Sequence, residues 1–288
     1  MEIRADESKS LTIHIGLPKT ASTYLQKVVF PGFLSHEEFA FGERAKKMLQ
    51  SEHHLPSSVK VLSAEAWSNS LLAGGYENNF CRFIANLNNV KRRKVKILFF
   101  VRNHEDWLVS SYLQLAKASY WKPKTFRKYI QSFGDCDLSW ARRIEDLSGQ
   151  KTLICEYEAF RKNKEFWVQE IVKFMGGVPL DMKKLKNSEK KMNATPNTML
   201  SLWLARGLAL GTEFPDLTFK KVFGRRLIFG GNSRADFARV WVRDALIHLA
   251  DELPGSDPLK EKLEIQIPQS MRTIFEEDRR AIGKYLAK

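Results

Sequence analysis

A lysine and a group of hydroxyl side chains lie close together near the start of the chain, in the segment GLPKTAST. Lys19 carries a full positive charge, and Thr20, Ala21, Ser22 and Thr23 follow it directly. Hydroxyl groups and the unpaired amides of a helix N-terminus donate hydrogen bonds to an anion, and a lysine neutralises its charge. The segment is therefore a candidate phosphate or sulfate site. The alternative is an ordinary turn with hydroxyl caps and a solvated lysine.

An arginine and a serine form a second candidate anion site, in the segment ILFFVRNHEDWLVSSYLQ. Arg102 ends a strand-like run, and Ser110 follows eight residues later, early in a predicted helix. The arginine fork can bind a phosphate through two parallel hydrogen bonds, and the serine hydroxyl can add a third. Taken alone, an arginine at the end of a strand is also a common structural residue.

The sequence predicts the elements that would position these residues. Continuous apolar runs at residues 11–16, 59–64, 95–102 and 151–156 are typical of strands buried on both faces of a parallel sheet. Helical patterns lie between them, so we expect an α/β fold with a doubly wound, mainly parallel sheet flanked by helices. Ligands in such folds bind at the carboxyl ends of the strands.

The strand signal fades beyond Gly176. We expect a flexible tail over residues 1–10 and one domain over residues 11–288, with an α/β nucleotide-binding core at 11–180 and a mostly helical extension at 181–288. Helical patterns occur in TPNTMLSLWLARGLAL, ADFARVWVRDALIHLADEL and PQSMRTIFEEDRRAIGKYL.

The two candidate anion segments, in this order and spacing, resemble the phosphate-binding motifs of sulfotransferases. The first resembles the 5′-phosphosulfate loop, Pro-Lys-Ser/Thr-Gly-Thr/Ser-Thr, with Ala21 where the family commonly has glycine. The second resembles the motif Arg-x7-Ser-x-Tyr, which Tyr112 completes. The strand LICEYEAF and the helix ending IVKFMGGVPL are also similar to segments of this family. The resemblance covers about residues 11 to 180.

This resemblance implies an enzyme that takes its sulfuryl group from 3′-phosphoadenosine 5′-phosphosulfate (PAPS) and releases adenosine 3′,5′-bisphosphate (PAP). It implies that Lys19 stabilises the leaving phosphate, and that Arg102 and Ser110 bind the 3′-phosphate. The residues implied in binding the 5′-phosphate are Pro18, Lys19, Thr20, Ala21, Ser22 and Thr23.

A further nucleotide-binding segment is expected at KKMNATPN. Animal cytosolic sulfotransferases have a Gly-x-x-Gly-x-x-Lys segment over the nucleotide, which this sequence lacks. Bacterial relatives often have a basic-Asn-Ser/Thr segment instead, so Lys191, Asn193 and Thr195 are candidate contacts. A solvated loop before a helix capped at Thr195 is the alternative.

The candidate general base is Glu65. The run VKVLSAEAW predicts a strand ending near Ala64, which places Glu65 at the carboxyl edge of the sheet, beside the turn with Lys19. Carbohydrate and tyrosyl-protein sulfotransferases use a glutamate as base, and this favours a sugar hydroxyl as acceptor. A capping or ion-paired glutamate is the alternative, with His53 or His54 as the base.

Composition limits the other function classes. The 47 Lys and Arg residues exceed the 33 Asp and Glu residues, giving a net charge of +14 that favours anionic partners. A P-loop phosphotransferase is disfavoured because no Gly-Lys-Ser/Thr occurs. A non-catalytic polyanion-binding protein remains open, although no nucleic-acid-binding motif is present. Carbohydrate and small-molecule acceptors remain open, as does the oligomeric state.

Histidines and cysteines lack the spacing of metal ligands, so we expect no bound metal ion. The three scattered cysteines favour reduced thiols. The start of the chain has no signal-peptide pattern, and the longest apolar run is too short to span a bilayer. We therefore expect a cytoplasmic protein.

Overall fold

A computed structural model describes residues 10–17, 20–50, 55–67, 75–90, 93–116, 125–182 and 263–286. The chain forms two compact units, which we describe separately. The first comprises Met1–His104, Ser132–Glu189 and Gln269–Lys288, and the second comprises Glu105–Gln131 and Lys190–Pro268.

The first unit contains a five-stranded sheet in the order β2-β3-β1-β4-β5, and every neighbouring pair is parallel. The strands are β1 Ser10–Gly16, β2 Phe39–Phe41, β3 Val61–Ser63, β4 Lys94–Val101 and β5 Lys151–Glu156. The predicted parallel α/β sheet is confirmed. The chain adds strands on both sides of β1, which is the doubly wound arrangement.

Two details of the sheet differ from the sequence prediction. The short strand β2 was not expected, because three residues show no periodicity. Strand β3 is shorter than the predicted run 59–64. The amide of Val59 donates to the Pro56 carbonyl at 3.1 Å, so the chain is still in a turn at this point.

Helical segments occur in both units. Those of the first unit are α1 Ser22–Tyr24, η2 Leu25–Val29, η3 Phe30–Gly32, α2 Gly42–Gln50, η4 Glu65–Trp67, η5 Tyr76–Cys81, α3 Arg82–Asn86, η6 Leu87–Val90, α6 Asp135–Leu138, α7 Trp140–Asp146, α8 Tyr157–Lys162, α9 Lys164–Met175 and α15 Gln269–Leu286. Helix α4 spans His104–Ala116. Its first residue, His104, is the last residue of the stretch Met1–His104 of the first unit, and the rest of the helix belongs to the second unit. The second unit also contains α5, Phe126–Ile130. None of the described helices is long and apolar enough to cross a membrane.

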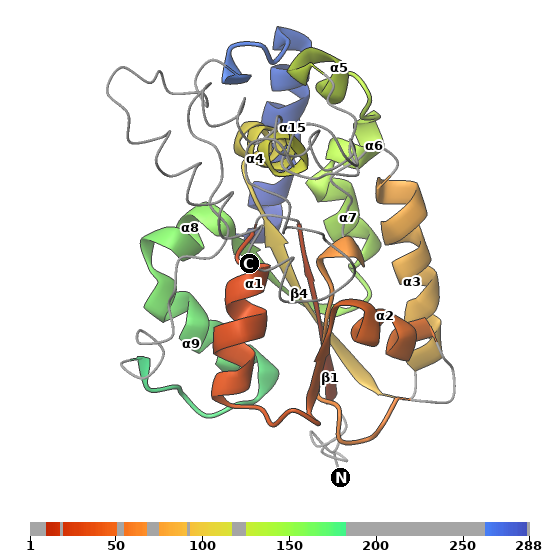
Figure 1. Ribbon diagram of the computed structural model, residues 1–288, viewed down its shortest axis with the longest axis vertical. Coiled ribbons are helices and arrows are strands. Elements are labelled where there is room, and N and C mark those ends of the chain that lie inside the picture. The colour runs from red at the N-terminus through yellow and green to blue at the C-terminus, as the bar shows by residue number, and fades with distance from the viewer. Residues whose placement is uncertain are drawn as a thin grey trace, which may run out of the picture. The chain divides into compact units, whose positions relative to one another are not determined.

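Helices cover both faces of the sheet. Figure 1 shows α1, α8 and α9 on one side of β1 and β4, and α2, α3 and α7 on the other. The first side has a buried apolar core that joins the helices to β4 and β5; its members include Val29, Phe30, Leu98, Phe100, Cys155, Phe160, Val168 and Val172. The segment after β1 is therefore held against the sheet by apolar packing.

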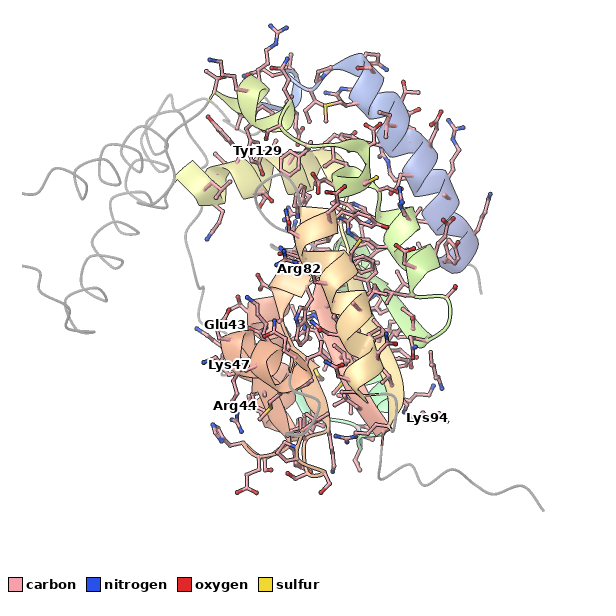
Figure 2. The ribbon with its side chains drawn as sticks, turned by 90° about the vertical axis from the view of Figure 1, so that its right-hand side faces the viewer. Glu43, Arg44, Lys47, Arg82, Lys94 and Tyr129 are labelled. Carbon is pink, nitrogen blue, oxygen red and sulfur yellow. The ribbon has the colours of Figure 1, made fainter. Side chains whose placement is uncertain are left out.

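Helix α2 is amphipathic. Ala45 and Leu49 are buried against the first unit, whereas the charged side chains of Glu43, Arg44 and Lys47 are exposed and point away from the sheet (Figure 2). Arg44 and Lys47 add positive charge to this exposed face, and Glu43 offsets part of it.

The C-terminal helix α15 is confirmed, whereas the expected helices at residues 195–210 and 235–253 lie outside the described residues. One buried carboxylate attaches α15 to the rest of the first unit. Asp278 accepts hydrogen bonds from the Ser139 hydroxyl at 2.7 Å and from the Trp140 amide at 2.9 Å. It also contacts His104 Nε2 at 3.2 Å. Since Ser139 and Trp140 begin α7, Asp278 satisfies the amides at the start of that helix.

We expect Asp278→Asn to lower the free energy of unfolding by about 2 kcal/mol, because it weakens several charge-assisted hydrogen bonds at a buried site. Burial opposes the charge on Asp278, but hydrogen bonds from His104 and Ser139 favour it, and the pKa of the carboxyl is lowered. A lowered pKa stabilises the fold above the unfolded-state pKa, and this contribution disappears as pH falls through the folded-state pKa. Urea denaturation of the asparagine variant should therefore show a smaller loss of stability on acidification. The exposed neighbour Glu277, changed to Gln, is the control.

Candidate functional site

Four adjacent strands bring chain segments to one edge of the sheet. Because β3, β1, β4 and β5 are parallel neighbours, their carboxyl ends lie side by side. Neighbouring strands are about 5 Å apart, so about 15 Å separates the ends of β3 and β5. The residues that follow these ends include Thr20, Ala21 and Ser22 after β1, Glu65 after β3, Arg102 after β4, and Tyr157 and Glu158 after β5.

The turn after β1 holds two buried hydroxyl side chains. The Thr20 hydroxyl donates a hydrogen bond to the Leu17 carbonyl, so a contribution of Thr20 to anion binding would come from its backbone amide. The Ser22 hydroxyl is buried and has no hydrogen-bond partner among the described residues. Thr23 is half-buried. Pro18 and Lys19 lie outside the described residues, so their predicted roles stay predictions.

Ala21 adopts a backbone conformation that normally requires glycine. Its φ of 62° and ψ of 2° are in the left-handed region, and it is the residue that precedes helix α1. This is the position where the resembled motif has glycine. The turn therefore keeps its shape with a methyl group, at a steric cost of about 1 kcal/mol.

We expect Ala21→Gly to raise the free energy of unfolding by up to about 1 kcal/mol, because glycine adopts a positive φ without strain. Part of this gain is lost to the greater freedom of glycine in the unfolded chain. Thermal or urea unfolding measures the change. Ala45→Gly in α2, where the residue is buried in a regular helix, is the control and should be destabilising. Lower stability in the Ala21 variant would show that the positive φ carries no strain.

A hydrogen-bonded group lies beneath this turn. His14, on β1, is fully buried, and its Nδ1 lies 2.7 Å from the Ser63 hydroxyl on β3. The Gln26 side-chain amide donates to the same hydroxyl at 2.9 Å. Burial lowers the pKa of His14 to about 3, so the imidazole is neutral at physiological pH. This group connects β1, β3 and the helical segment after the turn.

Arg102 is oriented by the segment that follows β5. Its guanidinium carbon lies 4.7 Å from the centre of the Tyr157 ring, and its Nε lies 3.8 Å from Glu158. The Arg102 carbonyl accepts a hydrogen bond from Trp140 Nε1 at 3.0 Å. The side chain is 12% exposed. The stacking on Tyr157 and the contact at Nε hold a mostly buried guanidinium at the carboxyl edge of the sheet.

Glu65 lies two residues after the end of β3, close to the predicted position. It is half-buried and begins the short helix η4. The residue before it, Ala64, donates its amide to the His14 carbonyl at 3.1 Å, so η4 starts beside β1. The backbone of Glu65 therefore lies close to the strand that leads into the hydroxyl-bearing turn. Whether it acts as a base stays a prediction.

The remaining predicted site residues have different outcomes. Ser110 is half-buried on α4, in the second unit. Tyr112 is buried in the same unit, with ring centres 5.1 Å from Phe126 and 5.5 Å from Tyr129, which is a packing role. The candidates Lys191, Asn193, Thr195, His53 and His54 lie outside the described residues. The part of the chain that the structure describes contains no cluster of three or more potential metal ligands.

Sequence reasoning missed several residues of this region. His14 was considered only as a metal ligand, and Ser63 and Gln26 were not considered. The available signal was a buried-type strand that carries a histidine two residues before the glycine of the turn. The Tyr-Glu pair after β5 was noticed, but its contact with Arg102 was not expected.

Comparison with known proteins gives one family match. The family model described as "Sulfotransferase domain" matches residues 12–199. A mouse sulfotransferase complexed with PAP has 17% identity and a TM-score of 0.44, covering 90% of this chain and 89% of that chain. A sulfotransferase from Alicyclobacillus acidocaldarius has 13% identity and a TM-score of 0.43, covering 83% and 96%. A retinol dehydratase in a complex with retinol and PAP has 10% identity and a TM-score of 0.42, covering 96% and 81%. A search of curated proteins finds no match.

Proposed function

Because the chain belongs to the sulfotransferase domain family, we propose that it transfers a sulfuryl group from PAPS to an acceptor hydroxyl or amine. The observation that carries this proposal is the position of two anion-binding elements at one sheet edge. The buried, hydroxyl-bearing turn follows β1, and the stacked guanidinium of Arg102 follows the adjacent strand β4.

The turn would bind the 5′-phosphate of the donor. Ser22 supplies a buried hydroxyl without another partner among the described residues, and the backbone amides of the turn add further donors. Lys19 would neutralise the charge that develops on the phosphate as the bond to sulfur breaks. We assign the 3′-phosphate to Arg102 together with Ser110, and further nucleotide contacts to Lys191, Asn193 and Thr195.

The transfer itself needs in-line placement and a base. The acceptor oxygen or nitrogen forms a bond to sulfur while the bond from sulfur to the phosphate oxygen breaks, and the acceptor proton passes to Glu65. The leaving group is PAP. Since two cationic side chains, those of Lys19 and Arg102, would neutralise the phosphates, we propose a reaction without a metal ion. The glutamate base favours a carbohydrate hydroxyl, or that of a small molecule, as the acceptor.

Calorimetric titration tests the donor assignment. A sulfotransferase should bind PAP about tenfold or more tightly than ATP, because its two phosphate sites match the 3′- and 5′-positions. Tighter binding of ATP would favour a phosphotransferase instead. Binding of a long polyphosphate with a steep salt dependence, and no nucleotide preference, would favour a polyanion-binding protein.

An acceptor screen with radiolabelled PAPS then tests the activity. Oligosaccharides, monosaccharides, phenols and amines each provide one class of acceptor. Transfer of label to any of them establishes sulfuryl transfer, and the product identifies the class. Hydrolysis alone, at the rate of the buffer control, across the whole panel would contradict the proposed acceptor range.

A further inference from the structure

Three polar atoms converge on the α-carbon of Gly16, at the end of β1. A methyl group at this glycine would lie 2.6 Å from Ser22 Oγ, 3.0 Å from Thr20 Oγ1 and 3.1 Å from His14 Nε2. The absence of a side chain is what lets the three atoms approach. Ser22 Oγ and His14 Nε2 are both buried, and neither has a hydrogen-bond partner among the described residues.

The hydrogen bonds on the other side of His14 are compatible with a tautomer that carries its proton at Nε2. The Gln26 amide donates to Ser63 Oγ at 2.9 Å, which leaves the hydroxyl hydrogen of Ser63 available as a donor. His14 Nδ1 lies 2.7 Å from that oxygen, and the inference assigns it as the acceptor of this hydrogen. A neutral imidazole that accepts at Nδ1 carries its proton at Nε2. Nε2 is therefore a hydrogen-bond donor directed at the turn.

The surroundings of the ring keep it in this form. The edges of Phe30 and Phe100 lie against the imidazole, with ring centres 5.8 Å away in both cases. Burial among apolar rings disfavours the imidazolium, and it lowers the pKa of His14 to about 3. The Nε2–H donor is thus neutral and persists across the physiological pH range.

Of the two hydroxyl groups near this donor, only that of Ser22 can both accept a hydrogen bond from His14 and donate one to an anion. The Thr20 hydroxyl already donates its hydrogen to the Leu17 carbonyl, so it has no hydrogen for an anion. Ser22 can accept from His14 Nε2 with a lone pair and still donate its own hydrogen. The two atoms are not hydrogen-bonded to each other in this structure, so the interaction requires the Ser22 side chain to turn toward Nε2 when the anion binds.

We propose that Gln26, Ser63, His14 and Ser22 form a directional hydrogen-bond chain that ends on the bound 5′-phosphate, with His14 as a positioning residue. This inference rests on the proposed donor site. The Gln26–Ser63 and Ser63–His14 hydrogen bonds are present in the structure. In the proposed chain, His14 Nε2 donates to the Ser22 hydroxyl once the anion binds, and the hydrogen of that hydroxyl points to the phosphate oxygen. Hydrogen bonds in such a chain polarise and strengthen one another. The chain also links the phosphate turn to β3, whose next segment carries Glu65.

A double-mutant cycle with PAP tests the chain. His14→Phe keeps an aromatic ring among Phe30 and Phe100 but removes the donor. We expect it to weaken PAP binding about fivefold to tenfold, and Ser22→Ala about tenfold, on the scale of single hydrogen bonds to a charged group. Because both act through one hydroxyl, the double variant should bind no more weakly than Ser22→Ala alone. Additive losses, or unchanged affinity in His14→Phe, would overturn the inference.

If His14→Phe does not fold, a second variant and a spectroscopic measurement still test the inference. Nitrogen-15 NMR of histidine-labelled wild-type protein should show His14 neutral and protonated at Nε2, with a shift on PAP addition that Ser22→Ala abolishes. Ser63→Ala removes the hydroxyl hydrogen that fixes the tautomer, and should weaken PAP binding about threefold to fivefold. Protonation at Nδ1 in the wild type would overturn the chain alone. Absence of PAP binding to the wild type would instead overturn the proposed function, and the inference with it.

Discussion

Replacement of Arg102 by alanine is expected to weaken PAP binding about a hundredfold or more, equivalent to about 3 kcal/mol. In the proposed site the guanidinium pairs with the 3′-phosphate, and its removal leaves a doubly charged group without its main partner. The guanidinium lies over the Tyr157 ring, 4.7 Å from its centre, and this contact restricts the side chain before the ligand binds. Little side-chain entropy is then lost on binding.

Adenosine 5′-phosphate separates this role from a general loss of structure. The ligand lacks the 3′-phosphate, so Arg102→Ala should leave its affinity almost unchanged while weakening PAP binding. Arg161→Ala is a matched control, since Arg161 also lies over the Tyr157 ring, at 5.9 Å, but is exposed. If calorimetry finds equal losses for both ligands, or none for PAP, Arg102 does not bind the 3′-phosphate.

The layout of the sheet was predictable because its main strands are buried along most of their length. Strand β4 is buried over Lys96–Val101, and β1 over Leu11–Gly16, so both faces of each strand are covered; residues 97–101 form a continuous apolar run. Such runs indicate parallel strands covered on both faces. The shared carboxyl edge follows from the parallel direction alone, which is why the positions of Glu65 and Arg102 could be expected without coordinates.

Elements with weak local signals were not predictable. Strand β2 has three residues, and it pairs with β3 through tertiary contacts that no local pattern encodes. The positive φ of Ala21 is a second case, since alanine gives no sign of a left-handed conformation. Only the comparison with a glycine-containing motif drew attention to that position.

The partners of the site residues come from distant parts of the chain. Ser63 is 49 residues from His14, and their contact depends on the register in which His14 pairs with Ser63 across β1 and β3. Asp278 reaches His104 and the start of α7 from the C-terminal helix. A single sequence identifies chemically capable residues, but it does not show which of them the register and the packing bring together.

Replacement of Glu65 by glutamine is expected to lower the turnover number about a hundredfold or more while PAP binding is retained. The glutamine keeps the shape of the side chain but cannot accept the proton of the acceptor. The position supports this role, since Glu65 lies two residues after the end of β3. Ala64, between them, is hydrogen-bonded to β1, the strand that leads into the proposed phosphate turn. Donor phosphates and acceptor base would then meet at the same sheet edge.

The measurement is sulfate transfer from radiolabelled PAPS to the acceptor found in the screen, at saturating concentrations of both substrates and across a range of pH. Wild-type activity should fall at low pH, where the base is protonated, and this fall should be absent from the residual activity of Glu65→Gln. Glu156→Gln is the matched control, because Glu156 is an exposed carboxylate at the end of β5, on the same edge of the sheet. Its turnover should be close to that of the wild type. If Glu65→Gln retains near-normal turnover and the same acid limb, the base lies elsewhere, and the same assay on His53→Gln and His54→Gln identifies which histidine replaces it.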